Sequence, residues 1–424
     1  MKLILFILLN IILDAVIISA QQDSAFIYEN PGLNDLISSA LNTNAKLGPI
    51  EYEKKILSAS ISSVNKQSSP MLQLMVDLLP VDFSNAGEYS VSYSQPLKLF
   101  GKLDEQERLA RIRSGKPLIE KRELEIELIR SVKENYFMLS LNEKLSEFNK
   151  EFQKIMKSIS SSIEIQYSAG KGNQYEILKS NNELQKLLLE EIDLRNIRKL
   201  YINNLSTLSG KQLPENFITQ NIDILLKINP PVLDSATLIK DMVKNNTEFQ
   251  YLDQLNKENI SEKNIAGLER KPDLELMSGY KYMSDTKENF LLFSVLIDLP
   301  FMPWNSKRID AMLNEKLLME KKINSEYRSL KTNLGNELRN NIVKINSSLE
   351  KIDYIRSILI PQTEQVFKSS LISYETSSAG FIDLLDTYRE LRENNQMLLK
   401  EEIDYLISVS ELEKLTGKQI LTIN

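Results

Sequence analysis

The sequence contains no cysteine and no histidine among its 424 residues. Without them the chain has no disulfide, no thiolate nucleophile, no histidine acid–base group and none of the usual zinc and copper ligands. It also lacks the cysteine that N-terminal lipidation requires, so we expect no lipid at that end. A metal could be held only by carboxylates or by the 12 methionines, and we expect neither a metal nor a cofactor.

Glycine and proline are scarce as well, at 13 residues each, while hydrophobic residues make up 42% of the chain and charged residues 26%. This balance favours helices and excludes extensive disorder. The net charge of −6 and the lack of any Lys/Arg cluster argue against a nucleic-acid partner. No Gly-rich phosphate loop or nucleophile elbow is present, so we do not expect an enzyme. A further alternative is a hydrolase built on paired Asp and Glu carboxylates, which would need these residues in a compact pocket.

The first 22 residues, MKLILFILLNIILDAVIISAQQ, combine one cationic residue, Lys2, with an apolar run. The run is short for a membrane span and contains Asn10 and Asp14. Residues 1–20 are therefore predicted to be a cleaved export signal, with Ala20 as the last residue removed. The alternative is an uncleaved anchor. Asp14 has no functional explanation in either case.

Several landmarks occur twice in the same order. YSVSYSQPLKLFGK (89–102) corresponds to FSVLIDLPFMPWNSK (293–307), which places Val91 on Val295, Pro96 on Pro300 and Phe100 on Trp304, 204 residues apart. YSAGKGNQYEIL from Tyr167 corresponds to YETSSAGFIDLL from Tyr374, and LSGKQL from Leu208 corresponds to LTGKQI from Leu415, both 207 residues apart. This order indicates an internal tandem duplication.

We expect the same plan in each copy: a helix, a β-hairpin, a long helix, a turn and a returning helix. The first repeat is assigned to residues 21–213, with its hairpin at 71–96 and its helical turn near 167–175. A linker follows at 214–232. The second repeat is assigned to residues 233–424, with its hairpin at 273–300 and its turn near 374–386.

The strand patterns alternate with period two. Tyr89, Val91 and Tyr93 alternate with serines, and Leu72 and Leu74 lie opposite Gln73. Strands of this length cross a bilayer when tilted, but four strands cannot close a barrel, and open edges are forbidden in lipid. A membrane location would therefore require oligomerisation, and three chains would supply twelve strands. The alternative is a soluble domain with hairpins packed on helices.

The helical segments carry apolar stripes that are typical of helix–helix packing. In the first copy the stripe steps by four and three residues through Leu141, Leu145, Phe148, Phe152, Ile155 and Ile159. Leu187, Leu194, Tyr201 and Leu208 lie seven apart on the returning helix. Pro117, with Gly115 nearby, and Pro361 are expected to kink or interrupt the long helices.

With these features in place, the chain resembles the TolC-like outer-membrane efflux proteins, close to the metal and drug efflux branch. Three segments carry the resemblance: NPGLNDLISSAL, YSVSYSQPLKLFGKLDEQERLA, and the C-terminal stretch from LIPQTEQVFKSSLISYETSSAGFIDLLD to ELEKLTG. Each motif alone is weak, but the ordered set spans nearly the whole chain after the signal.

The resemblance implies a mostly α, α+β fold: a trimeric twelve-stranded outer-membrane β-barrel continuous with a long periplasmic α-helical coiled-coil barrel. It implies a passive exit duct of a tripartite efflux or type I secretion system. The implied partners are outer-membrane lipid, two further copies of the chain, a periplasmic adaptor and an inner-membrane pump. The alternative is an exported coiled-coil structural or adhesive protein without a channel.

The same resemblance implies roles for individual residues. Asp383, Asp386 and, in the first copy, Glu176 occupy the positions of a pore constriction. The turns that would dock the adaptor contain Gly170, Gly172, Ser377 and Gly380, and a basic residue found in some relatives is replaced here by Ala379. The joints between barrel and tunnel contain Pro96, Gly101, Pro300 and Trp304.

Overall fold

A computed structural model describes residues 31–77, 87–170, 172–220, 234–376 and 378–420. The expected signal (1–20), most of the expected linker and Ser377 lie outside these residues. The chain divides into two compact units. The helical unit comprises residues 1–45, 125–236 and 338–424, and the sheet unit comprises residues 46–124 and 237–337.

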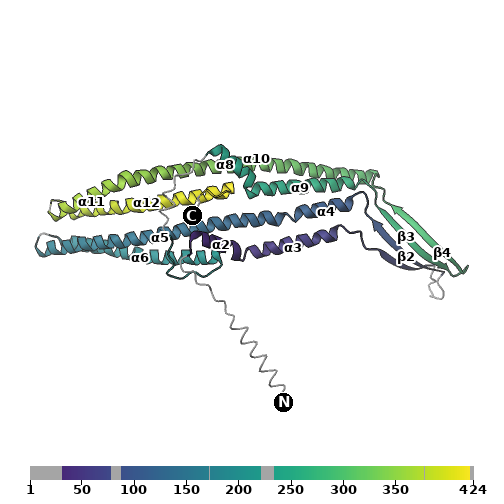
Figure 1. Ribbon diagram of the computed structural model, residues 1–424, viewed down its shortest axis with the longest axis horizontal. Coiled ribbons are helices and arrows are strands. Elements are labelled where there is room, and N and C mark those ends of the chain that lie inside the picture. Colours follow the sequence, from purple (N-terminus) through teal and green to yellow (C-terminus); the bar gives the residue numbers. More distant parts are fainter. Residues whose placement is uncertain (1–30, 78–86, 171, 221–233, 377, 421–424) are drawn as a thin grey trace, which may run out of the picture. The chain divides into compact units, whose positions relative to one another are not determined.

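The sheet unit contains a four-stranded antiparallel sheet in the order β1–β2–β3–β4 (Figure 1). The strands are β1 (Met71–Asp77), β2 (Glu88–Leu97), β3 (Leu274–Met283) and β4 (Glu288–Ile297). Since β2 pairs with β3, the two hairpins join into one sheet although almost 180 residues of sequence separate these strands. β1 and β4 are left as the two edges.

The two faces of the sheet differ in composition. Residues directly opposite one another in the register share a face, and one such row is Leu72, Tyr93, Ser278 and Phe293. We call this side the apolar face; apart from Gln95, Ser278 and Asn289 it consists of Leu72, Leu74, Val76, Tyr89, Val91, Tyr93, Leu97, Leu274, Leu276, Tyr280, Tyr282, Leu291, Phe293, Val295 and Ile297. We call the other side the polar face; it carries four serines, four acidic residues, Lys281 and Gln73, together with Pro96, Gly279, four methionines and three large apolar residues of β4. Phe293 is 81% exposed and Leu291 is 73% exposed within the chain, so no described residue covers the apolar face at these positions.

The helices of the sheet unit are α3 (Leu47–Val64), α4 (Lys102–Arg113), α8 (Ser235–Asn245), α9 (Thr247–Leu268) and the first parts of α5 (Lys116–Ser168) and α10 (Pro303–Tyr354). α4 packs against α3 and α9. The interruption expected from Gly115 and Pro117 is confirmed, because α4 ends at Arg113 and α5 begins at Lys116.

The helical unit contains α2 (Leu33–Thr43), the rest of α5 and α10, α6 (Gln174–Ser209), a π-helical turn η1 (Ile355–Leu359), α11 (Ile360–Glu375) and α12 (Phe381–Thr416). α5 with α6 and α11 with α12 form two helical hairpins (Figure 1). Both hairpins contribute to one buried cluster: Phe152, Met156, Ile159 and Ile163 from α5, Leu187 from α6, Phe367 and Tyr374 from α11, and Phe381, Leu384, Leu385, Tyr388 and Leu391 from α12. Parts of the apolar stripes on α5 and α6 thus form helix–helix core, as expected.

The interruption expected at Pro361 is also confirmed. It takes the form of η1, the five-residue π-helical turn that immediately precedes α11. Proline has no N–H to continue the α-helical hydrogen bonds, and a π turn shifts the pairing by one residue. The Thr363 hydroxyl donates to the Leu359 carbonyl at 2.7 Å and so satisfies one of the groups near the break.

The C-terminal end of α6 is held by the side chains of Ser39 in α2 and of Asn44, the residue that follows α2. Ser39 Oγ donates to the Ser209 carbonyl at 2.9 Å, and Asn44 Nδ2 donates to the Leu208 carbonyl at 3.0 Å. Helix ends leave their last carbonyls without intrahelical partners, so these bonds fix α2 on α6. Gly210 then ends the helix in the left-handed region, with φ at +66°.

Replacing Gly210 by alanine is expected to destabilise the helical unit more than the same change at Gly170. Both glycines have positive φ, which costs an L-residue about 1–2 kcal/mol. A Cβ on Gly210 would also lie 2.6 Å from Thr43 Oγ1 and 3.1 Å from the Thr43 carbonyl oxygen, while a Cβ on Gly170 meets nothing within 4 Å. The two variants are compared by urea unfolding followed by circular dichroism. Equal losses would contradict the close approach of α2.

In the described part of the chain, no helix combines the length and the apolar character of a bilayer-spanning segment.

Candidate functional site at the hairpin turns

The first helical hairpin reverses in a short turn between α5 and α6. Gly170 follows α5 with φ at +71°, and Asn173 begins α6 by accepting a hydrogen bond from the Tyr175 amide at 3.0 Å. A Cβ on Gly172 would lie 2.8 Å from the backbone nitrogen of Tyr167. Position 172 therefore has room for glycine and for no larger residue. Gly170 provides the backbone conformation that ends the preceding helix.

The second hairpin reverses differently. α11 ends at Glu375, and the amides of Ser378 and Ala379 both donate to the Ser373 carbonyl, at 2.8 and 3.1 Å. Gly380 begins α12 with an extended backbone that any residue adopts. The amide of Gly380 donates to Asp383 Oδ2 at 3.3 Å, so Asp383 caps its own helix.

The three acidic candidates lie in different surroundings. Asp383 and Asp386 are exposed on the first turns of α12, and the Asp386 side chain is 65% exposed with Arg389 Nη1 3.5 Å away. Glu176 is half-buried and accepts a hydrogen bond from Tyr374 Oη of the other hairpin at 3.3 Å. Burial, together with the Glu176 carboxylate, raises the pKa of Tyr374, so this phenol stays a donor at physiological pH. The structure thus brings Glu176 to the second hairpin and leaves the two aspartates on the surface.

Sequence reasoning missed two ion pairs between the hairpins. Arg389 of α12 donates to Glu183 of α6, and Arg392 of α12 donates to Glu190 of α6. Glu176, Glu183 and Glu190 lie seven residues apart on one helix, which indicates that they share a face but does not identify the residues that meet it.

Glu183 is the more buried of the two paired glutamates, with its side chain 7% exposed. Burial alone would raise the pKa of Glu183, but hydrogen bonds from Arg389 and Lys186 outweigh it and lower that pKa. The pair therefore stays ionised at pH values where an exposed glutamate becomes protonated. Its stabilising contribution is present above the ordinary pKa of glutamate and is lost as the pH falls through the lowered value.

The two strand-to-helix joints in the sheet unit share an exposed aromatic group. Gly101 precedes α4 with φ at +78°, and the residue before it, Phe100, also has a positive φ of 59° and is 52% exposed. Positive φ is a genuine outlier for a bulky residue, so Phe100 is strained where it stands. At the second joint Trp304 lies in the first turn of α10 and is 69% exposed.

The expectation that the first strand stops at Pro96 is wrong by one residue. β2 runs to Leu97, and Pro96 is still opposite Glu275 of β3. Proline is tolerated there because β1 pairs with β2 only as far as Ser94, so no strand needs the missing N–H on that side. At the second joint the strand ends earlier, at Ile297, three residues before Pro300.

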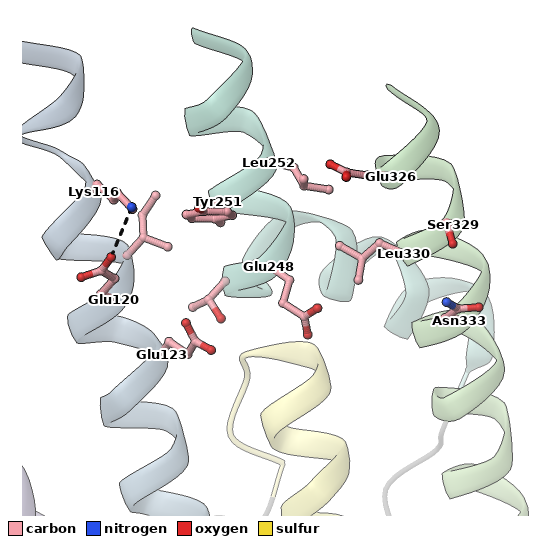
Figure 2. A pocket seen from close by; sticks show the side chains of 12 residues that line it. Lys116, Glu120, Glu123, Glu248, Tyr251, Leu252, Glu326, Ser329, Leu330 and Asn333 are labelled. Atoms are coloured by element: carbon pink, nitrogen blue, oxygen red, sulfur yellow. Dashed lines mark ion pairs between the residues drawn. The ribbon is translucent and has the colours of Figure 1, made fainter. Parts of the chain in front are cut away.

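A separate acidic pocket lies in the sheet unit among α5, α9 and α10 (Figure 2). It encloses about 500 Å³, and its charged lining consists of Lys116, Glu120, Glu123, Glu248 and Glu326. Lys116 pairs with Glu120 at 3.8 Å and lies over the ring of Tyr251, with its Nζ 5.5 Å from the centroid. Among the described residues no group of three or more Asp and Glu side chains has an arrangement that could hold a metal ion. We assign no site to this pocket.

Solved structures share this fold over almost the whole chain. CusC, in a study of its folding and transmembrane channel formation, superposes with a TM-score of 0.76 at 18% identity, covering 93% of this chain and 96% of that one. The outer-membrane channel OprN gives 0.76 at 14% identity, covering 91% and 90%. The outer-membrane channel MtrE of Neisseria gonorrhoeae, in its open state, gives 0.73 at 16% identity, covering 92% and 89%. The resemblance to TolC-like channels is thus confirmed at the level of the fold.

In sequence, the chain is similar to the cobalt-zinc-cadmium resistance protein CzcC of Cupriavidus metallidurans, with 24% identity over 130 residues. The alignment spans only 30% of this chain and 30% of CzcC. No protein-family model matches the chain.

Proposed function

We propose that the chain is the outer-membrane exit duct of a tripartite efflux or type I secretion system, which conducts its cargo passively. The observation that carries this proposal is the sheet. Its apolar face is exposed within one copy, its other face bears serines and charged residues, and no described strand pairs with the outer side of β1 or β4. Large exposed apolar patches mark surfaces that contact a membrane or another protein, and a membrane barrel explains such a patch together with two unpaired strand edges.

Closure of this sheet requires further copies of the chain. In lipid every backbone amide and carbonyl needs a partner, so β1 of one copy must pair with β4 of another. Three copies give twelve strands, with the apolar face toward lipid and the polar face toward the lumen. The fold of outer-membrane channels over more than nine-tenths of the chain supports this arrangement.

The helical hairpins would form the periplasmic tunnel, with their turns toward the inner membrane. In this proposal the turns at Gly170, Gly172, Ser377 and Gly380 dock a periplasmic adaptor, which connects the duct to an inner-membrane pump. Residues 1–20 would direct export and be removed. The similarity to CzcC makes divalent metal ions the first cargo to test.

The repeats at residues 21–213 and 233–424, joined by the linker 214–232, are part of the same proposal. In support of it, α6 and α12 are both 36 residues long, and their first and last residues are each 207 apart. Both helices also end at a left-handed glycine, Gly210 and Gly417. Two tandem copies explain why one chain contains two strand-to-helix joints.

The proposal is tested by recording currents from residues 21–424 in planar bilayers and by fractionating cells that express the chain. A duct gives ionic conductance and a heat-resistant trimer in the outer-membrane fraction. Secreted or surface material without either property would instead favour a structural or adhesive rod.

A charge on the apolar face is expected to prevent insertion, whereas the same charge on the polar face is tolerated. Phe293 lies near the middle of β4, and the next residue, Ser294, points to the opposite face. Arginine at a lipid-facing midplane position costs about 2–4 kcal/mol. Phe293→Arg should therefore reduce the inserted, heat-resistant trimer strongly, and Ser294→Arg should leave most of it. The assay is trimer yield in the outer-membrane fraction; similar yields would contradict the assignment of faces.

A further inference from the structure

The methionines of the sheet lie on one face. All four methionines of the described strands, Met71, Met75, Met277 and Met283, belong to the polar face. On the apolar face a methionine would be an ordinary hydrophobic side chain, yet these strands place none there. Methionine is usually buried, but Met71 is 56% exposed and Met75 is 46% exposed. Hydrophobic burial within the chain therefore does not explain where these side chains lie.

Two of the four methionines share a row across the sheet. Met71 of β1 lies opposite Ser94 of β2, and Ser94 lies opposite Met277 of β3. Neighbouring strands are about 4.8 Å apart, so the backbones of the two methionines are separated by about 9–10 Å, with the serine between them. Ser94 is only 7% exposed, whereas Ser90 and Ser92 of the same strand are half-buried. This burial is expected where two long side chains lean over a small one.

Methionine is suited to converge in this way. Its side chain is unbranched and has three rotatable bonds, so the sulfur atoms of Met71 and Met277 can both reach a point above Ser94. A thioether is a soft, polarizable and uncharged ligand, which favours soft cations such as Cu⁺ over Zn²⁺, Co²⁺ and the hard cations. It has no proton to lose on binding, so such a site would operate without the pH dependence of a histidine or cysteine site.

The charge of the polar face favours cations as well. Its four acidic residues outnumber its one basic residue, Lys281, which pairs with Glu88. Glu275 lies on the same face two residues before Met277 on β3. A negative surface raises the local concentration of cations whatever their softness. The carboxylates therefore attract cations in general, and the thioethers discriminate among them.

We propose that Met71 and Met277 form a binding site for a soft monovalent cation of the Ag⁺ or Cu⁺ type, and that such cations are among the cargo of the duct. The proposal deepens the proposed function, on which the direction of the polar face toward the lumen rests, by naming a class of cargo. From the sequence we expected no bound metal, because histidine and cysteine are absent. The register between strands that are distant in sequence is what brings the two thioethers into one row.

Binding is measured first, on the detergent-solubilised chain comprising residues 21–424, with Ag⁺ as the probe in nitrate salts. One variant carries Met71→Leu and Met277→Leu, which keep the volume and remove both thioethers of the row. Its matched control carries Met75→Leu and Met283→Leu, which remove two thioethers from the same strands and the same face. Equilibrium dialysis with elemental analysis gives the affinity and the number of ions per chain, and circular dichroism shows that both variants are folded.

We expect the wild type to bind one Ag⁺ per chain and to keep it in a tenfold excess of Zn²⁺. Loss of the supporting partner of a metal ligand already costs about 10–100-fold in affinity, so Met71→Leu with Met277→Leu should weaken binding by at least about tenfold. The control should stay within about twofold of the wild type. Unchanged binding in the first variant overturns the proposed site, and so does an equal loss in the control.

Conduction is measured second, in planar bilayers with potassium nitrate on both sides. An ion that pauses on the lumen wall interrupts the potassium current, so we expect micromolar Ag⁺ to cause brief blocks in the wild type and in the control. The variant without Met71 and Met277 should show at least about tenfold fewer blocks. Blocks that remain in this variant overturn the inference and leave the duct intact. Protein that binds Ag⁺ and inserts but carries no current overturns the proposed duct instead.

Discussion

Replacing Lys133 by methionine is expected to lower the free energy of unfolding of the helical unit by about 3–5 kcal/mol, because the substitution leaves a buried carboxylate without its cation. Lys133 of α5 donates to Glu413 of α12, and their side chains are 2% and 9% exposed. Methionine has a similar length and an apolar end, so packing around the stem is retained. The loss is measured by urea unfolding of the detergent-solubilised protein, followed by circular dichroism.

A double variant, Lys133→Met with Glu413→Gln, separates loss of the pair from loss of the charge. Glu413 Oε1 also accepts a hydrogen bond from the Ile420 amide at 2.7 Å, and glutamine keeps an acceptor for it. With no ion left to bury, the double variant should recover at least about half of the stability that the single variant loses. A double variant as unstable as the single one would show that the cost arises from packing and not from loss of the Lys133–Glu413 pair.

The strands, their faces and the helix breaks could be predicted from the sequence because their causes are local. The alternation around Tyr89, Val91 and Tyr93 sets one face of β2 whatever lies next to it. Likewise Gly115 and Pro117 interrupt a helix through their own backbone chemistry, and α4 and α5 separate there. Such features depend on a few neighbouring residues and can therefore be predicted from the sequence alone.

The contacts between hairpins could not be predicted, because they depend on which faces of distant helices meet. Glu183 and Arg389 are separated by 206 residues, and nothing local to either residue indicates the other. The seven-residue spacing of the glutamates on α6 shows that they share a face but does not show what covers it. The positive φ of Phe100 has no sequence signal either, since aromatic residues rarely adopt it.

Among the proposed site residues, Asp383 and Asp386 have the largest expected effect on conduction. Both carboxylates are exposed at the start of α12, and three chains around the lumen would bring six negative charges to one end of the tunnel. A narrow ring of carboxylates attracts cations and repels anions. We therefore expect wild-type currents to be small and cation-selective.

Asparagine is the informative replacement, because Asp383 also accepts a hydrogen bond from the Gly380 amide. The side-chain oxygen of an asparagine can still accept that bond. Asp383→Asn with Asp386→Asn should lower the cation-to-anion permeability ratio by roughly fivefold or more and raise the conductance, since the charge is removed while the cap of α12 remains. The measurement is the reversal potential in a salt gradient across a planar bilayer. Asp383→Glu with Asp386→Glu is the matched control: it retains the six charges and should retain the selectivity. If the asparagine variant keeps the selectivity of the wild type, the constriction lies elsewhere in the tunnel and these two aspartates serve only α12, Asp383 as its cap and Asp386 beside Arg389.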